Sequence, residues 1–210
     1  MTDNFEKFKP FMRLPEEEGG DAYYTIELVR RGKDCSGLPA ANYHFKNYYI
    51  DTMQKYERVQ PEIRLLCKTL RLRAYISVNR KSFRRVTMNT VAEMAGRMAQ
   101  DDFRRPYAVF ESCSGKDCSS DDRWFIVDID EDAFDEVDGE FKWERVLRLV
   151  NECSPEGKKV ELKLRTKSGV HLITRPFNRI QFSAMCKADP AIGHAFDVQK
   201  NHLTLLFEYL

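Results

Sequence analysis

The spacing of hydrophobic residues changes several times along this chain, and each change predicts a new element of secondary structure. Residues 22–30 and 43–50 have the composition of strands, and the Gly- and Pro-containing turn between them predicts a hairpin. From 52 to 70, apolar residues recur at helical spacing, with Pro61 expected to open or kink the helix. Residues 72–79 alternate again, which predicts another strand.

The second half continues this alternation of helices and strands. We expect a helix at 88–100, a loop at 112–122, a strand at 124–129, a helix at 141–152, strands at 158–166 and 171–174, a helix at 179–187 and a strand at 203–209. This order predicts an α+β fold with a mixed or antiparallel central sheet flanked by helices.

The N-terminal 20 residues resist regular structure, because they combine two prolines, an acidic run and Gly19-Gly20. We therefore expect a flexible arm at 1–20 and a single α+β domain at 21–210, with an N-terminal half at 21–105 and a second half at 106–210. At 210 residues and 42% hydrophobic content, the chain can build one substantial core.

Charge and cysteine content exclude several classes of protein. The net charge of +1 shows no global attraction to nucleic acid, so any such binding must use a local patch. The six cysteines are scattered, and the N-terminus lacks a basic and then apolar signal region, which predicts a reducing cytoplasm. No apolar run approaches the roughly 18 to 20 residues that span a bilayer, so we expect no membrane association.

Asp128 and Asp130 are the most informative pair of residues. They end the apolar segment 124–129, which has the composition of a strand buried on both faces, and carboxylates there are costly unless they are paired or bound to metal. Side chains two apart on a strand share a face, so both can converge on one Mg²⁺ or Mn²⁺ ion. A solvated acidic turn is the alternative, because further acidic residues follow.

A second motif, Ser168-Gly169-Val170-His171, begins the strand expected at 171–174. An imidazole nitrogen of His171 can donate to a phosphate oxygen, with the Ser168 hydroxyl and the Gly169 N–H as neutral donors. Three flanking residues can add positive charge: Arg165, Lys167 and Arg175. Taken alone, His171 is also compatible with an ordinary strand histidine.

Together, these motifs resemble the archaeo-eukaryotic primase, or primase-polymerase, superfamily. The likeness lies in the order of motifs across roughly residues 70–200: an Asp-x-Asp strand, a helix, and a strand leading to Ser-x-x-His, here in a compressed form. The resemblance implies a catalytic core like an RNA-recognition motif (RRM) beside an N-terminal αβ half. It also implies that the carboxylates bind two divalent ions and that the His171 strand contacts the triphosphate of the incoming nucleotide.

The resemblance further implies a third carboxylate downstream and a set of partners. Asp197 is our candidate for this ligand, although a helix cap or turn explains it equally well, and Glu208 is the alternative. The implied partners are nucleoside triphosphates, single-stranded or primed nucleic acid, and a helicase or other replication proteins. A phage or bacterial replication, repair or defence setting fits the family.

A basic run follows the strand at 72–79. It consists of Arg80, Lys81, Phe83, Arg84 and Arg85 around Ser82. An aromatic ring set among cations suits a nucleic-acid backbone with one stacked base. The structural alternative is a solvated turn.

Three further interpretations stay open. Asp128 with Glu161-Leu-Lys163 has the Asp…Glu-x-Lys layout of a metal-dependent nuclease. A primase-like fold can also be catalytically silent, and then serves as a nucleic-acid-binding or assembly module. Zinc is not expected, because the spacing of Cys113 and Cys118 suits half of a zinc knuckle but no second pair follows.

Overall fold

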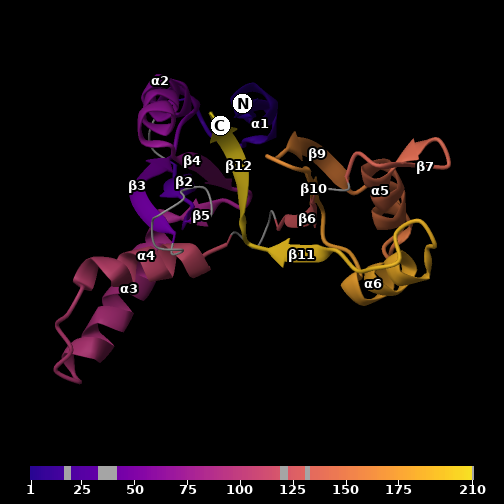
Figure 1. Cartoon of the computed structure of the whole chain (residues 1–210). Coiled ribbons are helices and arrows are strands. Elements are labelled where there is room, and N and C mark those ends of the chain that lie inside the picture. The colour runs from indigo at the N-terminus through magenta and orange to yellow at the C-terminus, as the bar shows by residue number, and fades with distance from the viewer. Residues whose placement is uncertain (17–19, 33–41, 119–122, 131–132, 210) are drawn as a thin grey trace.

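The computed structural model describes residues 1–16, 20–32, 42–118, 123–130 and 133–209, which form an α+β structure of antiparallel sheets and helices (Figure 1). Within these residues, the first sheet has the strand order β1-β12-β4-β2-β3, with β5 paired to β2. Its strands are β1 (Thr2–Asp3), β2 (Ala22–Arg30), β3 (Tyr43–Ile50), β4 (Arg73–Ser77), β5 (Lys81–Ser82) and β12 (Leu203–Glu208).

The second sheet has the order β11-β6-β10-β9, and a short third pair joins β7 to β8. These strands are β6 (Phe125–Ile129), β7 (Glu136–Val137), β8 (Glu140–Phe141), β9 (Val160–Arg165), β10 (Val170–Thr174) and β11 (Asp197–Lys200). The helices are α1 (Phe5–Phe8), the 3₁₀ turn η1 (Lys9–Phe11), α2 (Met53–Leu70), α3 (Phe83–Met98), α4 (Pro106–Lys116), α5 (Lys142–Glu152) and α6 (Arg179–Ala188). No helix among the described residues is long and apolar enough to cross a membrane.

The expected arm at 1–20 is wrong for its first half. Thr2 and Asp3 pair with the last strand, and the Phe5 and Phe8 side chains are fully buried in the core beneath α2. Burying a side chain of this size contributes about 1.5 to 3 kcal/mol, which outweighs the turn-forming composition around it. The N-terminus and the C-terminus consequently lie side by side (Figure 1).

The hairpin, the strand after α2, α5, α6 and the last strand are confirmed within a few residues. The helix expected at 88–100 begins earlier, at Phe83, because the Ser82 side chain caps it by accepting from the Arg85 N–H. The loop expected at 112–122 is wrong over its first part, since α4 continues to Lys116. Helix α2 runs on through Pro61.

The second sheet has two different faces. The chain order β6-α5-β9-β10-α6-β11 with β6 and β10 central is a split β-α-β arrangement, and neighbouring strands are antiparallel. Val127 and Leu172 lie on the face that packs with α5 and α6. Ile126 and Ile173 lie on the opposite face and join the core of the first sheet.

Two buried asparagines connect the halves. The Asn79 amide donates to the Trp124 carbonyl at 3.1 Å and accepts from the Trp124 N–H at 2.7 Å. The Asn4 amide donates to the carbonyl oxygens of Arg165 and Leu205, which belong to different sheets. These bonds and the shared core hold the first sheet against the second.

Candidate functional site

The strand register of the second sheet places three of the expected site residues in one row. Asp128 on β6 stands opposite His171 on β10 and, on its other side, opposite Asp197 on β11. Residues directly opposite one another project from the same face of a sheet. The three side chains therefore share the face that carries Ile126, away from α5 and α6.

Asp128 and His171 form an ion pair, with 3.1 Å between Oδ1 and Nε2. The other ring nitrogen of His171, Nδ1, lies 2.9 Å from the Thr204 hydroxyl of β12, so both ring nitrogens are engaged. Burial acts to raise the pKa of Asp128, and the hydrogen bond from His171 opposes it. Together with the electrostatic influence of the nearby His171, His202 and Arg31 side chains, that bond holds the pKa of Asp128 below its usual value.

A cleft of about 500 Å³ lies in front of Asp128 and His171, between the two sheets, and Asp197 is not among the described residues that line it. Asp128, Asp130, Ser168, Lys167 and His171 line it from the second sheet and its turn. The sequence motifs thus meet at one cavity although 37 residues or more separate the carboxylates from the turn.

The first sheet contributes cleft residues that the sequence motifs did not identify. They are Glu27, Val29, Arg31, Asn42, His44, Arg73, Tyr75, His202, Leu203 and Leu205, with Gln199 from β11. Arg31 donates to the Tyr75 hydroxyl at 3.1 Å, and Arg73 forms a buried ion pair with Glu208 at 2.9 Å. For Arg73, the available signal was a single basic residue at the start of the mostly apolar strand Arg73–Ser77.

Gly169 brings the turn against the end of β6. A Cβ atom at this position would lie 1.9 Å from the Ile129 carbonyl oxygen and 2.7 Å from that of Asp130. Only glycine permits this approach. The Gly169 N–H donates to the Thr166 hydroxyl at 2.9 Å, so its expected role as a donor to phosphate is wrong.

Two of the three cations expected beside His171 lie elsewhere. Arg165 stands opposite Val170, on the sheet face away from the cleft, and its guanidinium lies 5.3 Å from the Phe134 ring centroid. Arg175 follows the far end of β10, where it contacts Glu161 and the Trp124 ring. Lys167 alone of the three lines the cleft.

The two candidates for a third carboxylate differ in placement. Asp197 is exposed on the row described above, where it accepts a hydrogen bond from Gln199 at 2.8 Å. Glu208 is 1% exposed and paired with Arg73, so it is part of the protein interior. Among the described residues, no group of three or more His, Cys, Asp or Glu side chains is arranged to hold a metal ion.

Most side chains of the basic run at 80–85 contact other parts of the structure, which contradicts the expectation of an open template-binding turn. The Lys81 ammonium is buried and donates to the carbonyls of Ser114 and Asp117. Phe83 stacks on Tyr23 with ring centroids 4.2 Å apart, so its ring already has a partner.

The arginines of this run differ among themselves. Arg85 pairs with Asp117 through two nitrogens, at 2.9 and 3.1 Å. Arg80 donates to the Arg13 carbonyl. Arg84 is exposed within the first turn of α3. Any nucleic-acid contact here is therefore limited to the arginine side chains.

The chain matches no protein-family model, and no match is found among curated proteins or among solved structures. The geometry of the cleft is therefore the basis for assigning a function to the chain.

Proposed function

We propose that this protein catalyses divalent-metal-dependent nucleotidyl transfer on a nucleic-acid template, as a minimal primase-polymerase with an RRM-like catalytic core. The observation that carries the proposal is the row of Asp197, Asp128 and His171 across three neighbouring strands, with Asp130 beside the same cleft. The split β-α-β order of the second sheet agrees with the core that the sequence resemblance implies.

The donor set fits Mg²⁺ or Mn²⁺ that arrives with a nucleotide. Asp128 and Asp130 supply hard oxygen ligands, and the low pKa of Asp128 keeps this carboxylate ionised at neutral pH. One or two carboxylates suffice where substrate phosphates complete the coordination, so a cage of protein ligands is not required. When bound, such ions increase the nucleophilicity of an attacking hydroxyl and stabilise the charge on the leaving pyrophosphate.

The remaining cleft residues suit a triphosphate. Lys167 and the Ser168 hydroxyl line one side of the cleft beside His171, and Arg31 and Arg73 line the other. Guanidinium and ammonium groups attract phosphate oxygens by charge and hydrogen bonding. Asp128 and Thr204 fix the orientation of the His171 ring from both of its nitrogens.

The nuclease layout lacks support from the geometry. Lys163 stands opposite Leu172, so it projects from the sheet face that packs with the helices, not from the face of Asp128. Glu161 lies at a register shift in β9, where it pairs with Arg175 at 3.2 Å, and it does not line the cleft. Lys163 instead contacts the Trp143 ring. A silent binding module remains the contrasting candidate, because the described residues lack a three-ligand metal group.

Incorporation of labelled nucleotides on a single-stranded template in the presence of Mn²⁺ tests the proposal. We expect product from the wild type and none from the variant with both Asp128→Asn and Asp130→Asn. Asp51→Asn is the matched control, because Asp51 pairs with Lys55 at 3.0 Å and does not line the cleft. Template degradation would favour a nuclease, and absence of any metal-dependent product would favour the silent module.

A further inference from the structure

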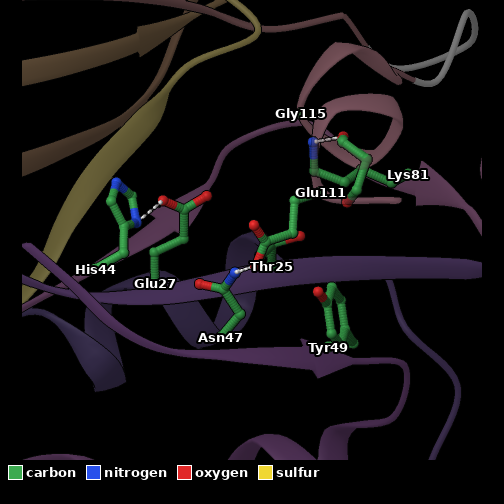
Figure 2. Close-up of a pocket in the computed structure, with 9 residues that line it drawn as sticks. Thr25, Glu27, His44, Asn47, Tyr49, Lys81, Glu111 and Gly115 are labelled. Carbon is green, nitrogen blue, oxygen red and sulfur yellow. Dashed lines mark hydrogen bonds and ion pairs between the residues drawn. The ribbon is translucent and has the colours of Figure 1, made fainter. Parts of the chain in front are cut away.

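A second, smaller pocket of about 220 Å³ adjoins the cleft (Figure 2). We call it the β2–β3 pocket and define it by Thr25, Glu27, His44, Asn47, Tyr49 and Glu111. Lys81, Ser114 and Gly115 complete its lining. Glu27 and His44 line both cavities, so a ligand in the cleft can extend into this pocket.

The pocket is rich in hydrogen-bond acceptors. The Glu27 carboxylate contacts His44 at 3.5 Å, and the Glu111 carboxylate accepts from the Asn47 amide at 3.5 Å. Figure 2 shows the Glu111 carboxylate between Asn47 and Lys81. Both contacts are at the long limit of hydrogen bonding, so the two carboxylates keep capacity for further donors.

Two buried oxygens beside these carboxylates lack partners. The Thr25 hydroxyl, in a residue that is 3% exposed, and the Asn47 carbonyl oxygen make no hydrogen bond within the described part of the chain. An unsatisfied buried oxygen costs about 1 to 3 kcal/mol, so proteins keep few of them without a reason. Thr25 and Asn47 both line the pocket, so its wall holds hydrogen-bonding capacity that the described residues do not use.

The charged residues of the wall favour a ligand with N–H donors. Glu27 and Glu111 bring two carboxylates, and the Lys81 ammonium donates to the Ser114 carbonyl. A group with several N–H donors and no negative charge fits these carboxylates. Tyr49 adds an aromatic wall, held by edge contacts with Tyr23 and Phe110 at ring-centroid distances of 5.7 and 5.5 Å.

We propose that the β2–β3 pocket binds the guanine base of a nucleotide whose phosphates occupy the cleft. Guanine presents two adjacent donors, N1–H and the N2 amino group, which match the two oxygens of the Glu111 carboxylate. Adenine and cytosine place a ring-nitrogen acceptor beside their single amino group, and uracil flanks its N–H with two carbonyls, so each would face the carboxylate with an acceptor. An aromatic side chain such as Tyr49 suits stacking with any base.

This inference deepens the proposed function and rests on it for the position of the phosphates. Base binding alone can be measured without metal or phosphates. We expect guanosine to bind the full-length wild-type chain at least about tenfold more tightly than adenosine by calorimetry, since a well-matched pair of hydrogen bonds discriminates bases by about 1 to 3 kcal/mol. Glu111→Gln should abolish the preference, because an amide presents a donor where the carboxylate presented an acceptor.

Controls separate this inference from the proposed function. Glu111 is exposed, so its replacement should leave the fold intact, and Glu57→Gln on α2 should keep the preference because Glu57 pairs with Lys9 outside both cavities. Asp128→Asn should also keep guanosine binding. Equal or undetectable binding of guanosine and adenosine by the wild type would overturn the inference, even if Mn²⁺-dependent incorporation is found. Selective guanosine binding without incorporation would instead overturn only the proposed function.

Discussion

Asp128 and His171 meet at 3.1 Å because their strands pair in a register that puts the two residues directly opposite each other. A slip of one residue would send one side chain to the helix-covered face. The alternation of Ile126 and Val127 between two separate cores opposes such a slip. The hydrophobic pattern of β6 thereby sets the geometry of the polar pair.

Thr204 should act as a positioning residue for His171. Thr204→Val removes the hydroxyl that lies 2.9 Å from Nδ1 while keeping the shape of the buried side chain. We expect the KM for nucleoside triphosphate to rise by about fivefold, since a net hydrogen bond contributes roughly 1 kcal/mol. Steady-state incorporation kinetics would measure the change, with kcat affected less than KM.

Thr174→Val is the matched control for this prediction. Thr174 lies on the same strand as His171 and is fully buried, but its hydroxyl has no hydrogen-bond partner within the described residues. Removing an unsatisfied hydroxyl should leave KM unchanged and should not lower the free energy of unfolding. A similar increase in KM for both variants would contradict the positioning role of Thr204.

Asp128 should make the free energy of unfolding depend on pH in the acidic range. Its pKa is lower in the folded protein than the ordinary value of about 3.9, so its stabilising contribution is complete above that pH and disappears as pH falls through the folded-state pKa. The unfolding free energy of Asp128→Asn should therefore be lower than that of the wild type at pH 6 and closer to it at pH 3. Urea denaturation at both pH values measures this difference, and an equal or larger gap at pH 3 would contradict it.

The sequence predicted the second half of the chain better than the first twenty residues. Apolar periodicity located β6, α5, β10 and α6 because each has a buried stripe or face. Apolar periodicity could not locate the N-terminal segment, because Phe5 and Phe8 are too few for a periodic pattern. Only the completed core shows where these two side chains are buried.

The candidate site was predictable only for residues near its two motifs. Asp128, Asp130 and His171 lie in local patterns, and the antiparallel pairing brings them together. Arg31, Arg73 and Thr204 come from segments distant in the sequence, so only the packing of the two sheets shows that they approach the cleft. The basic run at 80–85 was an unreliable indication of template binding, because Lys81 donates to a buried carbonyl and Arg85 pairs with Asp117.

The third carboxylate can be assigned by separating stability from metal affinity. Glu208→Gln breaks a buried ion pair with Arg73 and should lower the free energy of unfolding by about 3 to 5 kcal/mol, without changing the Mn²⁺ affinity of the folded protein. Asp197→Asn should instead weaken Mn²⁺ binding and leave the free energy of unfolding nearly unchanged, because Asp197 is exposed on the row of Asp128. Thermal denaturation measures the change in stability, and calorimetric titration with Mn²⁺ and a nucleotide measures the change in metal affinity. Weaker Mn²⁺ binding by folded Glu208→Gln would instead identify Glu208 as the third carboxylate.

Gly169→Ala should damage both stability and activity. The new Cβ would lie within 2.7 Å of two backbone oxygens at the end of β6, and neither oxygen can move without displacing Asp130 or the strand. Overpacking of this kind costs about 1 to 3 kcal/mol. Because the displaced backbone carries Asp130, we expect Mn²⁺-dependent incorporation to fall more than the loss of folded protein explains, measured at a temperature where the variant stays folded.

Gly96→Ala provides the contrast, because the two substitutions add the same methyl group. Gly96 lies within α3, and a Cβ there meets nothing within 4 Å. Alanine favours a helix over glycine by about 1 kcal/mol, so this variant should be more stable than the wild type and equally active. If Gly169→Ala instead matched Gly96→Ala in stability and activity, close contact between the turn and Asp130 would not be needed to build the site.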